Sequence, residues 1–262
     1  MTRTLAVCFA HPDDEAYATF GSVALHRADP DFRVVALHAT DGAAGEVAPG
    51  VDVGPAGLGA LRREEDERAW RAVGCVPARH DWLGLPDGAV EQMPFDDLVD
   101  CVACFLDEER PDVVVTFGPD GVTGHPDHIT VGAATDAAFH RVRRDGGGGL
   151  RRLLHGAIRQ SWFERHQAWR AAHGYPLWEP TRLYHLRGTP DELVGVDVRT
   201  TEVLPQLVAG LLEHRSQGHV LLPAGVEDGS FLRSRSRETH VLAWPPRQPD
   251  EPCLTDIFEG LD

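Results

Sequence analysis

Hydrophobic and polar residues follow two different spacings in the first half of the chain. Short, almost wholly apolar runs predict buried strands at residues 4–9, 32–38 and 112–117, and a weaker run predicts a strand at 79–83. Between them, apolar residues recur every three or four positions, which predicts helices at residues 15–26, 61–73, 95–109 and 126–142. Strands that alternate with helices favour parallel pairing through right-handed crossovers. We therefore expect an α/β fold with a Rossmann-like, mostly parallel sheet flanked by helices.

The pattern is less regular beyond a run of glycines at residues 146–149, which is typical of a flexible connection. There we expect helices at residues 158–173 and 202–214 and short strands at 182–186 and 194–198. We therefore distinguish a Rossmann-like core, residues 1–145, from a C-terminal part, residues 146–262, that completes the sheet and forms the rim of a binding site. A chain of 262 residues is expected to form a single compact domain from both parts.

The composition excludes several classes of protein. The chain has 25 basic residues, 41 acidic residues and a net charge of -16, which would repel a nucleic acid backbone. No run approaches the length of a membrane-spanning helix, and the first apolar run is too short for a signal peptide. The five cysteines are an odd number and are scattered, which suits a reducing compartment better than a disulfide framework. We expect a cytoplasmic protein with no nucleic acid or membrane partner; a homo-oligomer stays open.

A first polar cluster, His11-Pro12-Asp13-Asp14-Glu15, directly follows the first predicted strand. Three consecutive acids beside a histidine repel one another unless a cation or hydrogen bonds compensate, so the cluster indicates a metal. The alternative is that Asp13 and Asp14 only stabilise the positive end of the helix that follows. That alternative does not account for a second histidine motif further along the chain.

The second cluster, His125-Pro126-Asp127-His128, follows the fourth predicted strand. Ligands bind at the carboxyl ends of strands in parallel α/β sheets, so the two clusters meet in one cleft if their strands are neighbours. Two histidines and a carboxylate, with a fourth position open to water, form the ligand set of hydrolytic zinc sites. The same ligands would also accept Fe²⁺ or Co²⁺.

These motifs resemble the PIG-L/LmbE-like family of zinc-dependent N-acetylglucosaminyl deacetylases. The resemblance covers most of residues 4–142 and is thin after Gly149. It is carried by Ala10-His11-Pro12-Asp13-Asp14-Glu15, Thr40-Asp41-Gly42 with Gly45-Glu46, Leu61-Arg62-Arg63-Glu64-Glu65, Gly84-Leu85-Pro86-Asp87-Gly88, Pro111-Asp112-Val113-Val114 and Gly124-His125-Pro126-Asp127-His128.

The resemblance implies that His11, Asp14 and His128 are the zinc ligands and that Asp13 is the general base. This assignment agrees with general chemistry, because zinc lowers the pKa of bound water to about 7 and an unbound carboxylate next to a ligand can accept its proton. Glu15 either holds the surrounding histidines or simply begins the helix.

The resemblance also implies roles for four further residues. His125 would stabilise the oxyanion and protonate the leaving amine, with Asp127 orienting it, and Arg62 and Asp87 would contact sugar hydroxyls. Arg62 could equally belong to a solvated helix face, as mixed charges usually do.

The chain departs from the family at one position. Some members place a tyrosine two residues before the first histidine of the second motif, where it assists the oxyanion, and this chain has Thr123. The chain contains three tyrosines, and the sequence does not rank Tyr17, Tyr175 and Tyr184 as replacements.

The resemblance implies a metal-dependent hydrolase that removes an N-acetyl or other N-acyl group from an amino sugar within a small-molecule glycoside or conjugate. One alternative is an amidase that cleaves a bulkier amide, such as a thiol conjugate. The other is a non-catalytic protein that binds a metal or a carbohydrate. A nucleotide-binding enzyme is disfavoured, because no G-x-G-x-x-G sequence follows the first strand.

Overall fold

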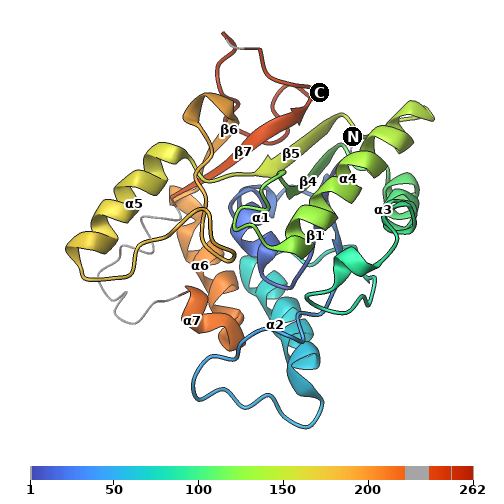
Figure 1. The fold of residues 1–262 in the computed structure, drawn as a ribbon. Coiled ribbons are helices and arrows are strands. Elements are labelled where there is room, and N and C mark those ends of the chain that lie inside the picture. Colours follow the sequence, from blue (N-terminus) through green and yellow to red (C-terminus); the bar gives the residue numbers. More distant parts are fainter. Residues whose placement is uncertain (1, 222–235, 249, 262) are drawn as a thin grey trace.

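A computed structural model describes residues 2–221, 236–248 and 250–261. One mixed sheet of seven strands, ordered β3-β2-β1-β4-β5-β7-β6, runs through the molecule (Figure 1). Its strands are β1 (Arg3–Phe9), β2 (Phe32–His38), β3 (Arg79–Trp82), β4 (Val113–Phe117), β5 (Arg152–Gly156), β6 (Val194–Arg199) and β7 (Arg237–Trp244). Strands β1 to β5 pair in parallel, and β7 lies antiparallel between β5 and β6. The predicted Rossmann-like, mostly parallel sheet is confirmed.

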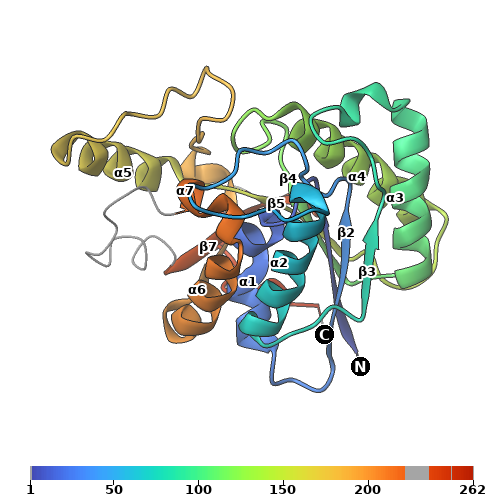
Figure 2. The same ribbon diagram turned by 90° about the horizontal axis from the view of Figure 1, so that it is seen from below.

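Helices cover both faces of the sheet (Figure 2). Helices α1 (Asp14–His26), α2 (Gly57–Val73) and α6 (Leu204–Glu213) pack together on one face, and α3 (Phe95–Glu109) and α4 (Pro126–Arg144) pack together on the other. The described chain also contains α5 (Gln160–Ala172), which projects to one side, and the short α7 (Gly218–Leu221). The central strands β1 and β4 are buried between these layers, which is why their sequences are mostly apolar.

Strands β5 and β7 were not predicted, because both carry buried polar residues. β5 begins with Arg152, whose guanidinium is buried and donates to the carbonyl oxygens of Ile257 and Glu259. In β7, Glu238 and His240 are buried as well, and Glu238 accepts hydrogen bonds from Ser22. Side chains that ordinarily face solvent therefore occupy interior positions, which hides the apolar pattern of both strands.

The predicted strand at 182–186 is wrong, since this segment forms turns and irregular backbone. It belongs to a long excursion, residues 157–193, that leaves the sheet after β5 and returns at β6. The base of the excursion is closed where Ile158 and Gln160 exchange backbone hydrogen bonds with Thr189. Within it, α5 carries a stacked row of aromatic rings, Trp162, His166, Trp169 and His173, so these tryptophans pack mainly against their own neighbours.

The strand order places the two histidine motifs side by side. β1 pairs with β2 on one side and with β4 on the other, so the chain changes direction across the sheet between β1 and β4. In open α/β sheets such a switch point forms the crevice where ligands bind. Among the described residues, no helix has the length and apolar character needed to cross a bilayer.

Candidate metal centre and active site

The first histidine motif makes the turn from β1 into α1. His11 follows the strand directly, and its backbone N–H donates to Asp14 Oδ2 at 2.8 Å. Asp13 caps the helix in a left-handed conformation, with φ 108° and ψ -27°, which is unusual for any residue other than glycine. This turn places the carboxylate of Asp14 beside the ring of His11, and their closest side-chain atoms are 3.4 Å apart.

The second motif begins α4 in a similar manner. His125 caps the helix and Pro126 occupies its first turn, where a missing N–H costs little. The ring of His125 accepts the backbone N–H of Asp127 at Nδ1, over 3.1 Å. One residue further on, the ring of His128 points towards β1 and meets His11, with 3.1 Å between His11 Nδ1 and His128 Nε2.

His11, Asp14 and His128 therefore bring two ring nitrogens and the two oxygens of one carboxylate together. His11 Nδ1 lies 3.4 Å from Asp14 Oδ2, and His128 Nε2 lies 3.4 Å from Asp14 Oδ1. Zinc bonds of 2.0–2.1 Å in a tetrahedral site put neighbouring donor atoms about 3.3–3.4 Å apart. The spacing of these donor atoms matches that of a tetrahedral metal site.

The outer ring nitrogens show why these donors suit a cation. His128 Nδ1 lies 3.0 Å from the carbonyl oxygen of Gly121, which can only accept, so Nδ1 carries the proton and Nε2 carries a lone pair. His11 Nε2 faces two carboxylates, Asp87 Oδ1 at 3.0 Å and Asp127 Oδ2 at 3.3 Å, and donates to them. In neutral His11 the lone pair then lies on Nδ1. Two lone pairs meet across 3.1 Å, an arrangement that needs a proton or a metal ion between them.

His125 is a competing ligand, because it offers a nitrogen within 4.8 Å of the donor atoms of His11 and His128. Its Nδ1 is already occupied by the N–H of Asp127. Asp14 lies 3.4 Å from His11 through Oδ2 and 3.4 Å from His128 through Oδ1, and its carboxylate would offset the charge of a cation. The geometry therefore favours Asp14 as the third ligand.

Asp87 and Asp127 surround His11. Asp127 Oδ2 also accepts the N–H of Gly88 at 2.8 Å, and its Oδ1 accepts the N–H of Val90 at 3.1 Å. The expected partnership of Asp127 with His125 is therefore made by its backbone, whereas its carboxylate contacts His11. Carboxylates in this position orient a metal-binding histidine and raise its basicity.

The charges of the site shift the pKa values of its members. Burial lowers the pKa of His11, but hydrogen bonds to Asp127, Asp14 and Asp87 outweigh it and raise that pKa well above its usual range. Burial raises the pKa of Asp14, but His128 and His11 outweigh it and hold that pKa below its usual range. Burial lowers the pKa of His128 to about 4. The site therefore places positive charge at the point where a metal ion would lie.

Asp13 and Arg62 form a pair next to these donors. Burial raises the pKa of Asp13 to about 8, although the charge of Arg62 acts in the opposite direction. Arg62 Nη2 lies 3.4 Å from Asp13 Oδ2 and donates to the carbonyl oxygen of Pro12 at 2.6 Å. The Arg62 side chain is only 6% exposed, so the alternative that it belongs to a solvated helix face is wrong.

Tyr184, at the far end of the excursion, reaches His125. The two rings meet edge to face with 5.1 Å between centroids, and Tyr184 is 63% exposed. Arg187 attaches this segment to the loop before α4, since its N–H donates to the carbonyl oxygen of Val122 at 2.9 Å and its guanidinium lies against Gly124. Of the three tyrosines, Tyr184 is the one in ring contact with His125 among the described residues.

A second group of histidines and acids lies behind the first. It consists of Glu15, His38, Asp66 and His80, which come from α1, β2, α2 and β3. Sequence reasoning left His38 and His80 as ordinary core or surface residues. No spacing could have revealed the group, because its four members come from four separate elements.

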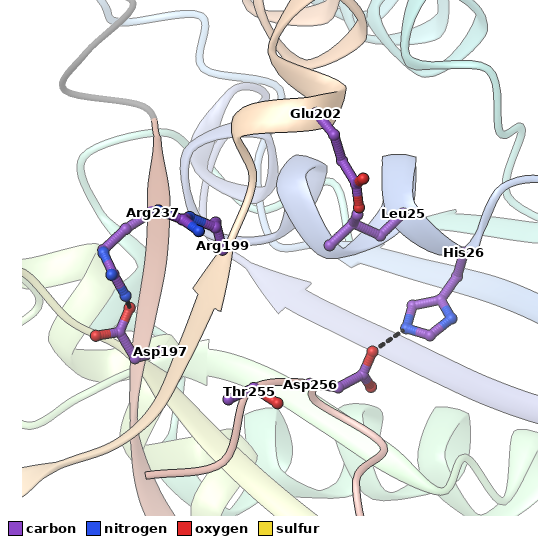
Figure 3. A pocket seen from close by; sticks show the side chains of 8 residues that line it. All are labelled: Leu25, His26, Asp197, Arg199, Glu202, Arg237, Thr255 and Asp256. Carbon is purple, nitrogen blue, oxygen red and sulfur yellow. Dashed lines mark hydrogen bonds and ion pairs between the residues drawn. The ribbon is translucent and has the colours of Figure 1, made fainter.

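A cleft of about 570 Å³ lies at the opposite end of α1, where His26 pairs with Asp256 (Figure 3). Its lining contains none of the expected site residues. Among its charged side chains, Asp197 pairs with Arg237 at 2.8 Å and Asp256 pairs with His26. The candidate metal site is therefore identified by the convergence of His11, Asp14 and His128, and not by this cleft.

The fold and the donor set define an α/β protein with a histidine–carboxylate centre at the switch point of its sheet. Residues 6–139 match the family model described as GlcNAc-PI de-N-acetylase, and the chain belongs to that family. It is 31% identical to the 1D-myo-inositol 2-acetamido-2-deoxy-alpha-D-glucopyranoside deacetylase 1 of Saccharopolyspora erythraea, over 98% of this chain and 94% of that protein.

Two solved structures share the fold. The N,N'-diacetylchitobiose deacetylase of Pyrococcus horikoshii superposes with a TM-score of 0.58 at 18% identity, covering 91% of this chain and 82% of that one. The 4-carboxy-2-hydroxymuconate hydratase of Pseudomonas putida KT2440 superposes with a TM-score of 0.59 at 15% identity, covering 96% and 100%. The fold therefore hosts more than one reaction, and function has to be argued from the site.

Proposed function

We propose that this protein is a metal-dependent N-deacetylase that releases acetate from an N-acetylated amino sugar held in a small-molecule glycoside. The observation that carries the proposal is the meeting of the ring nitrogens of His11 and His128 at 3.1 Å, with Asp14 beside them and Asp13 unbound next to them. The names of the relatives add support, since a family member 31% identical over nearly the whole chain is a deacetylase of an N-acetylglucosamine glycoside.

His11, Asp14 and His128 would hold the metal. Two imidazoles and one carboxylate suit Zn²⁺, and Fe²⁺ or Co²⁺ would accept the same donors. When bound, such an ion supplies Lewis-acid polarisation and makes a hydroxide available near neutral pH.

Asp13 would act as the general base. Its carboxylate is held by Arg62 rather than by a histidine of the centre, and in the ionised form, which predominates above its raised pKa of about 8, it can accept a proton from the attacking water. The water oxygen bonds to the acetamide carbonyl carbon, the C–N bond breaks, and the products are acetate and a free amine.

His125 would act as the hydrogen-bond donor to the acetamide oxygen of the substrate. Because its Nδ1 accepts the N–H of Asp127, the neutral ring carries its proton on Nε2. Burial lowers the pKa of His125, which favours this neutral form. The Nε2–H can stabilise the oxygen of the acetamide as it becomes negative, and a proton must reach the leaving nitrogen as the C–N bond breaks.

Tyr184 would form part of the substrate rim, because it is exposed and in contact with His125. The expected contacts of Arg62 and Asp87 with sugar hydroxyls stay predictions. Both side chains already have partners within the protein, Arg62 at the turn around Asp13 and Asp87 at His11.

Acetate release from a panel of N-acetylglucosaminides, with the metal content of the same preparation, tests the proposal. We expect equimolar acetate and amine, and release that stops with a chelator and returns with zinc. Turnover of bulky N-acyl conjugates alone would favour the amidase. Stoichiometric metal with no turnover of any acylated amino sugar would favour the non-catalytic protein. Asp13→Asn serves as the matched control, because acetate released equally by this variant would come from a reaction that does not use the candidate site.

A further inference from the structure

The peptide group between Pro12 and Asp13 is held from both sides. Arg62 Nη2 donates to the carbonyl oxygen of Pro12 at 2.6 Å. The N–H of Asp13 donates to Glu15 Oε2 at 3.1 Å. A non-glycine residue stays in a strained conformation only where its surroundings fix it, and these two contacts fix the φ of 108° at Asp13.

Glu15 is in turn held by His38. The distance from His38 Nε2 to Glu15 Oε2 is 2.9 Å, and both side chains are 0% exposed. A buried carboxylate depends on protein donors, and the other oxygen of Glu15, Oε1, has no hydrogen-bond partner among the described residues, with His214 Nε2 3.8 Å away. His38 is therefore what keeps Glu15 Oε2 at the N–H of Asp13.

His80 holds His38 from behind. His38 Nδ1 and His80 Nε2 are 2.9 Å apart, and the other nitrogen of His80 lies 3.5 Å from Asp66 Oδ2. Both histidine rings also stack on Trp82, with centroid distances of 4.7 Å. The stacking limits ring rotation, so the hydrogen-bonded row Glu15–His38–His80 has a fixed direction.

We propose that His38, supported by His80, is a positioning residue that sets the conformation of Asp13 through Glu15. The inference rests on the proposed function, in which Asp13 is the base. Neither histidine touches the candidate metal ligands through a hydrogen bond or ion pair that the described structure contains. Their effect should therefore fall on the rate of the reaction and not on metal content.

His38, Asp66 and His80 could also be regarded as a second metal site, since one donor atom from each lies within 4.8 Å of the others. The hydrogen bonds favour the positioning role. Both nitrogens of His38 lie 2.9 Å from a partner, Glu15 on one side and His80 on the other. Burial raises the pKa of Asp66, so its neutral carboxyl can donate towards His80, and each N–H along the row then faces an acceptor, with no two lone pairs left facing each other. A second metal ion per chain is therefore an outcome that would overturn the proposal.

The experiment compares His38→Leu, which removes the N–H donor, with His38→Gln, which keeps an N–H of similar reach. The control is His26→Gln. His26 ends α1, the helix that carries Glu15 at its other end, and its Nε2 pairs with Asp256 at 2.8 Å (Figure 3). Each purified variant is assayed for metal content, for kcat and KM of acetate release from an N-acetylglucosaminide, and for the φ of Asp13 in a metal-free crystal structure.

We expect kcat of His38→Leu to fall at least about tenfold, with KM within about twofold, because a shift of 1 Å in a reacting group can cost about 100-fold. His38→Gln should recover most of that loss, and metal content should stay at the level of the unmodified protein. In the crystal structure of His38→Leu, φ of Asp13 should leave the left-handed region.

Several results would overturn the proposal: an unchanged kcat in His38→Leu, equal loss in His38→Leu and His38→Gln, loss of metal together with activity, or a second metal ion. Should His38→Leu not fold, His80→Phe replaces it, since it keeps an aromatic ring beside Trp82 and removes the contacts to His38 and Asp66. If the unmodified protein releases no acetate, the proposed function fails, and φ of Asp13 in the variant still decides whether His38 sets the turn.

Discussion

Two groups of histidines and carboxylates meet at the turn formed by residues 11–15, and they differ in what their ring nitrogens face. The outer group contains the candidate metal ligands with Asp87 and Asp127, and the inner group consists of Glu15, His38, Asp66 and His80. In the outer group, carbonyl and carboxylate oxygens take the outer nitrogens of His11 and His128, so two inner nitrogens face each other at 3.1 Å. In the inner group, His38 contacts Glu15 with one nitrogen and His80 with the other. Burial raises the pKa of Asp66 well above its usual range, so its neutral carboxyl can donate towards His80, whose Nε2–H then donates to His38. Residue types are shared, but only in the outer group do two ring lone pairs of neutral histidines face each other.

The comparison shows that the direction of hydrogen bonds distinguishes a metal site from a structural network. Both groups are largely buried, and both contain at least two imidazoles and two carboxylates. What makes the outer group a candidate centre is that Gly121, Asp87 and Asp127 accept from its outer nitrogens. Four changes, in decreasing order of expected effect, test this distinction.

The largest effect is expected from removal of a ligand of the outer group. Asp14→Ala takes away the carboxylate that faces both His11 and His128, so the variant should hold no stoichiometric zinc after dialysis and should release no acetate. Metal analysis and the acetate assay measure both results. Zinc content equal to that of the unmodified protein would remove Asp14 from the ligand set and weaken the contrast between the two groups.

Asp13→Asn should separate binding from chemistry within the outer group. Asparagine tolerates the left-handed conformation, so the turn should persist, while the group that accepts a proton is lost. We expect full zinc content and a fall in kcat of about 100-fold to 10,000-fold. A variant with both full zinc content and unchanged kcat would exclude Asp13 as the base.

Asp127→Asn should weaken the acceptors that set the direction of the ring of His11. Loss of a carboxylate behind a metal-binding histidine typically costs about 10-fold to 100-fold in metal affinity. Titration with a competing chelator measures the change. The matched control is Asp136→Asn, whose carboxylate pairs with His155 at 2.8 Å outside the two groups and should leave metal affinity unchanged.

The smallest effect is a difference in stability with pH in the inner group. Burial lowers the pKa of His80 from 6.5 to about 3. Below pH 6.5 the unfolded chain therefore binds a proton that the folded chain does not. The stability from neutral His80 is complete above pH 6.5 and declines as the pH falls towards 3, by up to about 2 kcal/mol between pH 7 and 5.

Urea unfolding at pH 7 and pH 5, in the presence of a chelator, measures this decline. His80→Phe should lose less stability between the two pH values than the unmodified protein, because it carries no group that titrates at this position. Equal losses of unfolding free energy in the two proteins would show that His80 binds its proton as readily in the folded chain as in the unfolded chain. That result would contradict a buried, neutral His80.

Much of the core could be predicted from the sequence because its signals are local. The strands around the candidate site are mostly apolar, and each histidine motif is one short stretch of chain between a strand and the helix that follows it. The adjacency of β1 and β4, on which the meeting of the motifs depends, was only a condition of the sequence argument, and the structure supplies it. The choice of His11, Asp14 and His128 as ligands follows from the family resemblance and stays a prediction.

The remaining features depend on contacts between distant segments. β7 carries a buried glutamate whose partner, Ser22, lies more than 200 positions away, so its sequence alone suggests an exposed segment. His38 and His80 gain their partners only when β2, β3 and α1 pack together. Tyr184 reaches His125 through a segment with no regular structure, held by Arg187, and no periodicity marks such a contact.

The excursion at residues 157–193 leaves and rejoins the core at one place, where Ile158 and Gln160 hydrogen-bond to Thr189. When the two ends of an insertion are joined by hydrogen bonds, its length and sequence can vary without displacing the strands on either side. Grafting the corresponding segment of a relative between these anchor points would exchange the surface next to His125 while leaving the imidazoles of the centre in place. We therefore expect changes within residues 157–193 to alter which substrates are accepted, and changes at the centre to alter the reaction itself.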